Sequence, residues 1–173
     1  MTNETNITCA RMGRGGMAMG TQHQGSPTEI RALDAYIKLM RAAASVQGVM
    51  DARLAPLGFT ENQFGVLETI WHLGPMNQRT LVNKLLTSKA NINAIVDNLE
   101  KRGLVHRERE SKDKRHVTVH LTVEGRKIIA ELFPGHVALI VQTIGALTAS
   151  EQEILSALCK KLGIITMNVS VNK

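Results

Sequence analysis

The segment between residues 77 and 122 is rich in amide, small and basic side chains. An asparagine amide can form two hydrogen bonds with adenine in the major groove of DNA, and alanine leaves room for a helix to approach the bases. Lysine and arginine bind phosphates or enter a minor groove. The candidate major-groove residues are Ser88, Lys89, Ala90, Asn91, Asn93, Ala94 and Asn98. The candidate phosphate and minor-groove residues are Asn77, Gln78, Arg79, Lys112, Lys114 and Arg115.

The positive charge of the chain is concentrated in the same segment. The full sequence carries 21 Lys and Arg residues against 15 Asp and Glu residues, a formal net charge of +6. Residues 79 to 116 hold ten basic and five acidic residues, so they contribute +5 of that charge. A polyanion needs such a local patch, because the release of counterions from phosphates supplies most sequence-independent affinity. The charge therefore favours double-stranded DNA as the partner.

Two helices are predicted to position these side chains. The first is short and begins at Asn77, and a turn at Leu86–Thr87 follows it. The second begins at the N-cap Ser88 and ends before Gly103. Its apolar positions at i, i+3, i+4 and i+7 predict one buried face: Ile92, Ile95, Val96 and Leu99. The opposite face is either a DNA-reading surface or an ordinary solvated face.

A β-hairpin follows the two helices. Residues 104–109 and 116–121 are typical of strands, and the second strand alternates inward-facing Val117, Val119 and Leu121 with outward-facing residues. The basic tip at 110–115 is either a wing that contacts DNA or a solvated turn. Helix, turn, helix and hairpin in this order predict a winged helix-turn-helix. Winged helices also serve as protein-docking surfaces, so a protein-interaction module without DNA binding is an alternative.

The rest of the sequence predicts helices, so the fold class is mainly α with a small β-hairpin wing. Capping boxes mark three helix starts: Ser26–Glu29, Thr60–Gln63 and Thr148–Glu151. The first helix should end near Ala55, because Pro56 follows. The helical segment between Thr122 and Leu147 contains Pro134, which should kink or break it.

One winged-helix domain is predicted between two tails. Residues 1–25 are typical of a disordered N-terminal tail, 26–163 of the domain, and 164–173 of a C-terminal tail. Within the domain, residues 59–122 form the DNA-binding head, and helices at about 26–56 and 123–163 form a dimerisation region. These helices carry more apolar surface than one small head can cover. A homodimer is therefore favoured over a monomer.

The chain resembles the MarR family of bacterial transcription regulators over residues 28–163. The most specific marks are the run Leu-Glu-Lys-Arg-Gly-Leu-Val at 99–105 and the Asp-x-Arg of 113–115, followed by Leu-Thr at 121–122. The resemblance implies a homodimer that binds a pseudo-palindromic operator and is released by a small-molecule ligand or by thiol oxidation. It also implies that Arg115 reaches the minor groove and that Asp113 orients a basic wing residue. Ser or Thr is common in the family where this chain has Ala90, Asn91 and Asn93, so operator preference should differ.

A small aromatic or anionic molecule is a candidate effector. A cleft between the dimer helices and the head is expected near Tyr36, Met40, Trp71 and His72. An ordinary core is the alternative interpretation of these four side chains.

Other chemistry has less support in the sequence. It holds no glycine-rich phosphate loop, nucleophile elbow or metalloprotease motif in a fitting context, so we expect neither catalysis nor a cofactor. His106, His116 and His120 lie on the hairpin strands as candidate metal ligands, although exposed histidines near nucleic acid are more common. Cys159 is expected to be buried, and Cys9 is a candidate for oxidation. Metal or redox control is therefore an alternative to ligand control.

The expected location is the cytoplasm. Two cysteines without CxxC spacing fit a reducing compartment. The first 27 residues hold no apolar block of signal-peptide length. The longest uninterrupted apolar run is only five residues, Val137–Val141, so no membrane-spanning helix is expected.

Overall fold

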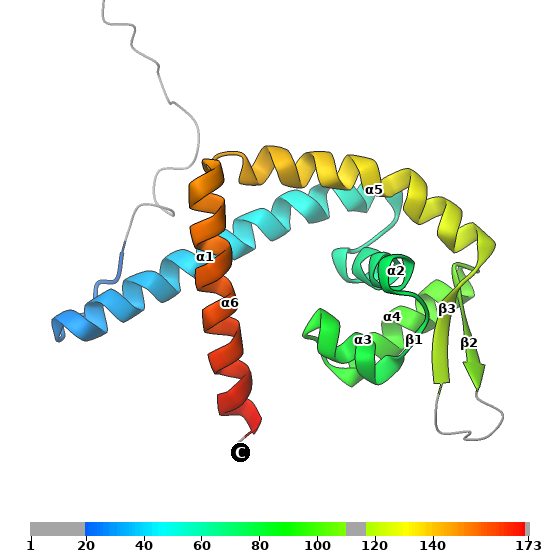
Figure 1. The fold of residues 1–173 in the computed structure, drawn as a ribbon, viewed down its shortest axis with the longest axis horizontal. Helices are drawn as coiled ribbons and strands as arrows, with labels where there is room; N and C mark the ends of the chain where they lie inside the picture. Colours follow the sequence, from blue (N-terminus) through cyan, green and yellow to red (C-terminus); the bar gives the residue numbers. More distant parts are fainter. Residues whose placement is uncertain (1–19, 110–116, 172–173) are drawn as a thin grey trace, which may run out of the picture. The chain divides into compact units, whose positions relative to one another are not determined.

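The computed structural model describes residues 20–109 and 117–171, with side chains described as far as residue 164 (Figure 1). Its elements in chain order are α1 (Pro27–Leu54), the 3₁₀ turn η1 (Ala55–Leu57), α2 (Glu61–Leu73), β1 (Met76–Asn77), α3 (Gln78–Leu85), α4 (Lys89–Lys101), β2 (Val105–Arg109), β3 (Val117–Leu121), α5 (Val123–Ile144) and α6 (Ala149–Val171). The chain forms two compact units that divide between Val49 and Met50.

All three predicted capping boxes are present. At the start of α2, Thr60 Oγ1 accepts from the Gln63 backbone N–H (3.2 Å), and the Thr60 N–H donates to Gln63 Oε1 (3.0 Å). The Ser26 and Thr148 N–H groups likewise donate to Glu29 (2.7 Å) and Glu151 (2.8 Å). These hydrogen bonds lower the pKa of both carboxyl groups, because they stabilise the charged form. The helix starts are therefore set by residues within one turn.

The core of the second unit is mainly aliphatic and fixes the orientation of α4. The stripe predicted for this helix is buried: Ile92, Ile95, Val96 and Leu99 are between 0% and 7% exposed. They pack in one cluster with Phe64, Leu67, Leu81 and Val119. Each such side chain contributes about 1.5–3 kcal/mol on burial, so rotation of α4 about its axis is strongly opposed. The opposite face of α4 is consequently held toward solvent.

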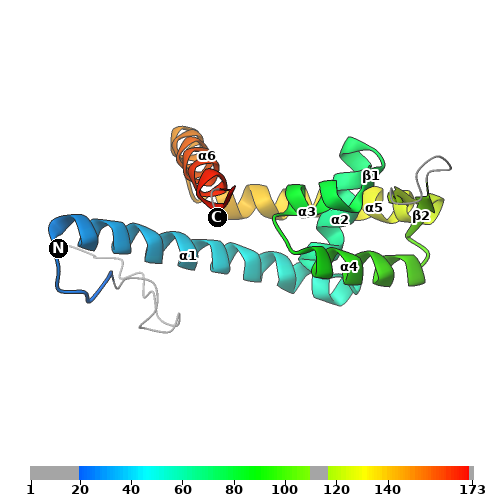
Figure 2. The same ribbon diagram turned by 90° about the horizontal axis from the view of Figure 1, so that it is seen from below.

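The sheet is three-stranded and antiparallel, in the order β1-β3-β2. β2 and β3 form the predicted hairpin, with His106 opposite His120. Strand β1, in which Met76 pairs with Val119 and Asn77 with Thr118, was not predicted from the sequence. Helices α2, α3 and α4 lie beside this sheet (Figures 1 and 2). The added strand joins the helix-turn-helix to the hairpin through backbone hydrogen bonds.

The prediction for Pro134 was a kink or a break. Helix α5 is continuous through this residue, so the break is wrong. Beside the proline, the Arg53 guanidinium donates to two carbonyls of α5: Nε to Gly135 O (3.1 Å) and Nη2 to Leu132 O (3.4 Å). The carbonyl that Pro134 leaves without its helical donor is that of Ala130, so Arg53 ties α5 to the end of α1 without replacing the missing hydrogen bond. By length and composition alone, α5 is also long and apolar enough to cross a membrane. A single helix of this kind is weak evidence for a membrane span.

Helix α6 differs from expectation in its end and in the environment of its cysteine. It continues to Val171, although a tail was predicted from residue 164. Cys159 is exposed, so the prediction that it is buried is wrong for the single chain. The large apolar side chains Ile154, Leu158 and Leu162 of this helix are also exposed. The predicted apolar stripe therefore exists, but no core in the described chain covers it.

Candidate nucleic-acid interface

The first turn of α4 presents small and polar side chains to solvent. Ser88 is the N-cap, and its Oγ accepts from the Asn91 backbone N–H (3.1 Å). Lys89, Ala90 and Ala94 are exposed, whereas Asn91 and Asn93 are half-buried. The Asn91 amide nitrogen donates to Thr87 Oγ1 (2.7 Å), so its oxygen is the group turned to other partners. This turn combines a helix N-terminus with small side chains, which suits close approach to DNA.

The supporting helix α3 is held by its own N-cap. Asn77 Oδ1 accepts from the Thr80 backbone N–H (2.8 Å) and from Thr80 Oγ1 (3.0 Å). Asn77 therefore serves the helix cap as well as being a predicted phosphate ligand. Arg79 is exposed. The turn between the helices passes through Leu86, which has a left-handed backbone (φ 49°) and is 76% exposed.

Arg107 on β2 ties the hairpin to α4. Its Nη1 donates to Glu100 Oε2 (2.7 Å), its Nη2 binds Asp97 Oδ1, and its backbone N–H donates to Glu100 Oε1 (2.8 Å). The Arg107 side chain is only 23% exposed. One guanidinium thus pairs with two carboxylates on α4 and offsets one of their two negative charges, which lessens a repulsion that phosphates would otherwise meet.

Gln78 and Asn93 join the same network. With its amide oriented to satisfy its neighbours, Gln78 donates to Asn93 Oδ1 (3.3 Å) and accepts from Arg107 Nη2 (3.2 Å) and Nε (3.3 Å). Two predicted DNA contacts are therefore brought together with Arg107, a residue that the sequence singled out only for its charge. Residues 78, 93 and 107 are far apart in the sequence, so no local sequence pattern predicts that their side chains meet.

Asn98 lies at the other end of α4 and has a partner on α2. Gln63 Nε2 donates to Asn98 Oδ1 at 2.9 Å, so this amide is engaged within the chain. Both residues line an open hollow of about 500 Å³ with Phe59 and Arg102. Arg102 stacks over the Phe59 ring (4.1 Å to the centroid) and donates to Gly58 O (2.8 Å). Asn98 is exposed, but its amide oxygen is already hydrogen-bonded within the chain.

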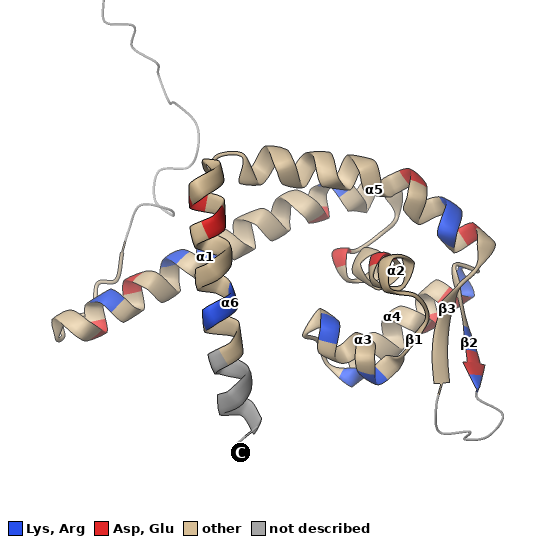
Figure 3. Ribbon diagram, viewed as in Figure 1, with Lys and Arg blue, Asp and Glu red and all other residues tan. Residues whose placement is uncertain are grey.

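Lys and Arg residues lie on α3, α4 and β2 (Figure 3). Within the described chain they include Arg79, Lys84, Lys89 and Arg109. The predicted wing residues Lys112, Asp113, Lys114 and Arg115 lie outside the described residues, as does His116. β2 and β3 lead into and out of that segment.

The four predicted effector residues lie in different units. Tyr36 and Met40 on α1 are 61% and 50% exposed. In the second unit, Trp71 and His72 on α2 form an aromatic cluster with Phe133, with ring centroids 4.6–5.1 Å apart. Trp71 also packs against the buried core.

Comparisons with known proteins identify the fold and the family. The family model described as "MarR family" matches residues 59–117. The uncharacterised HTH-type transcriptional regulator YkoM of Bacillus subtilis is 34% identical over 136 residues, which cover 78% of this chain and 87% of that protein. The B. subtilis HTH-type transcriptional repressor YetL is 26% identical over 157 residues, covering 88% and 92%.

A solved structure shows that the similarity extends to the three-dimensional fold. A cysteine-to-serine mutant of MarR from Escherichia coli, complexed with operator DNA, superposes with a TM-score of 0.67 at 28% identity. The match covers 80% of this chain and 99% of that one. The shared fold, the capped helix pair and the sequence identity to YkoM lead to one conclusion: the chain belongs to the MarR family and is a winged helix-turn-helix, DNA-binding transcription regulator.

Proposed function

We propose that this protein is a homodimeric repressor that inserts α4 into the major groove of a pseudo-palindromic operator. The observation that carries the proposal is the exposed first turn of α4, which Ser88 caps and the Arg107 network anchors. Ser88, Lys89, Ala90, Asn91, Asn93 and Ala94 would face the bases. Asn77, Gln78 and Arg79 would contact phosphate at the start of α3.

The wing is proposed as the second contact with DNA. Lys112, Lys114 and Arg115 would meet the adjacent minor groove, and Asp113 would orient one of the basic side chains. The support is positional, because β2 is fixed to α4 through Arg107 and carries the chain toward this segment. Asn98 is the weakest predicted reader, since its amide oxygen already accepts from Gln63.

Dimerisation is supported by apolar side chains that the single chain leaves exposed. On α5 and α6, Val141, Ile154 and Leu158 are 65%, 59% and 59% exposed. Helix α6 presents this stripe over several turns, and a second copy of the chain would bury it. Two heads related by a twofold axis would then read half-sites about one helical turn apart, or a multiple of it.

Repression and release are proposed from the family and from the aromatic residues of α2. YetL, which the chain resembles over most of its length, is named a repressor. Trp71 and His72, with Phe133, offer ring faces that suit a small aromatic effector, and the ring N–H groups of Trp71 and His72 are donors for an anionic one. Tyr36 and Met40 stay candidate effector residues on α1. We also propose a cytoplasmic location and no enzymatic activity.

A mobility-shift experiment tests the proposed function directly. The full chain is incubated with a fragment of the promoter region of its own gene, with an equal-length coding fragment as the control. A specific complex that forms only with the promoter fragment is the expected result. Equal binding to both fragments, or to neither at low salt, would overturn the proposal and favour a protein-interaction module.

A further inference from the structure

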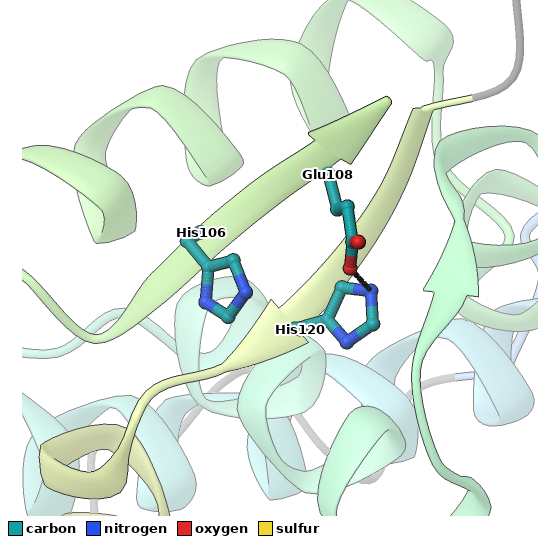
Figure 4. A group of neighbouring side chains, drawn as sticks. All are labelled: His106, Glu108 and His120. Atoms are coloured by element: carbon teal, nitrogen blue, oxygen red, sulfur yellow. Dashed lines mark ion pairs between the residues drawn. The ribbon is translucent and has the colours of Figure 1, made fainter. Parts of the chain in front are cut away.

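We propose that His106, Glu108 and His120 form a binding site for a divalent transition-metal ion of the zinc class on the hairpin. Two of these residues come from β2 and one from β3, and their side chains gather on one face of the hairpin (Figure 4). The three potential ligand atoms lie within 4.8 Å of one another. The inference concerns metal binding itself and does not depend on the proposed function.

The strand register places the three residues together. His106 pairs directly with His120 across the antiparallel ladder, and Glu108 pairs with Thr118, so Glu108 lies diagonally across from His120. Positions 106 and 108 are two residues apart and share a face of the sheet. Arg107 lies between them on the opposite face, where Asp97 and Glu100 bind its guanidinium. The nearest cation in the sequence is therefore turned away and neutralised.

The three side chains already lie close to the spacing that a metal site requires, and small side-chain rotations would complete it. The two imidazole rings are stacked, with centroids 5.1 Å apart and an interplanar angle of 14°. Glu108 Oε2 lies 3.2 Å from His120 Nε2. Ligand atoms around tetrahedral zinc stand about 3.3 Å apart, as follows from bond lengths near 2.05 Å. Closing the cluster from 4.8 Å to that spacing is a movement of about 1.5 Å, a distance that rotation about side-chain bonds can cover.

The donor set determines which metal the site would take. Two neutral imidazoles and one carboxylate are a common set for Zn²⁺, and they leave a fourth position for water. Calcium and magnesium prefer oxygen ligands only, so they fit this cluster poorly. The Glu108 side chain is 66% exposed and His106 is also exposed, so an ion can enter without moving the backbone.

A metal ion here would cross-link the two strands of the hairpin. β2 and β3 are joined by the segment that includes the predicted wing residues, so the ion would restrict how the two strand ends move relative to each other. From the sequence, His106, His116 and His120 were the candidates for this role. In the described residues the carboxylate of Glu108 takes the third position, and His116 lies outside them.

Isothermal titration calorimetry with ZnCl₂ tests the site in the full chain after treatment with a chelator. Both cysteines are replaced by serine in every protein used, so that thiolates do not compete. We expect one ion per chain, and we expect His106→Ala and Glu108→Gln each to weaken binding more than about tenfold. The matched control is His23→Ala, an exposed histidine that precedes α1, which should leave the affinity unchanged.

The site would be refuted if His106→Ala and Glu108→Gln bind Zn²⁺ as tightly as the parent, or if the parent does not bind. Both substitutions are at exposed positions, and circular dichroism verifies that each variant keeps its helices. The calorimetry contains no DNA. Failure to bind any promoter fragment would therefore count against the proposed function and leave this result standing.

Discussion

At the scale of single residues, the proposed recognition surface depends on a side chain that is itself mostly buried. Arg107 joins β2 to the carboxylates of Asp97 and Glu100 on α4 and also contacts Gln78. The Asp97 side chain is 55% exposed, so without a partner its charge would face incoming phosphates. Arg107 therefore ties α4 to the hairpin and offsets part of the negative charge on the helix that we propose to read DNA.

Replacing Arg107 by alanine should weaken DNA binding more than it weakens the fold. We expect a loss of about 1–2 kcal/mol in the free energy of unfolding, because the ion pairs are partly exposed. Fluorescence anisotropy with the promoter fragment should show a larger drop in affinity. The double variant Arg107→Ala/Asp97→Asn should recover part of the lost affinity. If the double variant binds no better than Arg107→Ala, charge suppression is not the role of this arginine.

His136 gives the fold a dependence on pH. The side chain is 6% exposed against the Phe64 ring (centroids 4.4 Å apart), and its Nδ1 has no hydrogen-bond partner within the described chain. Burial lowers the pKa of this imidazole, Glu68 partly opposes the shift, and Arg53 adds to it. Because the unfolded state then binds the proton more readily, stability is complete above about pH 6.5 and falls as pH decreases through the lowered folded pKa.

The His136→Phe variant should lose this component of the pH dependence. Urea unfolding measured between about pH 5 and 7 gives the free energy of unfolding at each pH, and the variant should show a flatter profile than the parent. His72→Phe, at an exposed position of α2, should keep the parent profile. A parallel shift of the His136→Phe curve with an unchanged slope would contradict the assignment.

At the scale of elements, the junction between the hairpin and α5 tolerates no side chain at Gly125. A Cβ built there would lie 2.0 Å from the backbone oxygen of Leu104. The same junction holds two hydrogen bonds, Thr122 N to Leu104 O (3.1 Å) and Thr122 Oγ1 to Gly103 O (2.7 Å). The sheet and α5 are therefore in backbone contact, and neither can move without the other.

Gly125→Ala should consequently destabilise the protein by about 1–3 kcal/mol, even though alanine favours helices. Gly48→Ala on α1 is the matched control, since a Cβ there meets nothing within 4 Å and should be neutral or slightly stabilising. Urea denaturation of both variants measures the difference. Equal stability of the two would mean that α5 shifts to accommodate the methyl group.

Most elements were predictable because their signals are local. The capping boxes and the stripe of α4 involve residues one to two turns apart, and the structure confirms them. β1 was missed because a two-residue strand exists only through its pairing with β3, about 40 residues later. The contact of Arg53 with Gly135, beside Pro134, was missed for a similar reason, since the two residues are far apart in the sequence. Contacts between distant residues leave no periodicity to detect.

At the scale of the whole molecule, the apolar stripe of α6 should hold two chains together. Leu158→Glu places a charge at a position that is 59% exposed in the single chain, so it should spare the head but disrupt a dimer. Ser156→Glu, at an exposed position of the same helix, is the control. Sedimentation equilibrium should report a dimer for the parent and the control and a monomer for Leu158→Glu. A monomeric parent would remove the proposed assembly.

The salt dependence of DNA binding then measures how many phosphates the assembly neutralises. Log affinity should fall linearly with log salt concentration, by about 0.9 for each phosphate contact in duplex DNA. If a dimer binds through two wings, Arg115→Ala removes one contact per chain and should lower the slope by about 2, whereas a monomer would lose about 1. Lys38→Ala, a charge removed from α1, should leave the slope unchanged. An unaltered slope in Arg115→Ala would mean that residue 115 does not contact DNA, and the groove contact would then have to come from the other basic residues of the head.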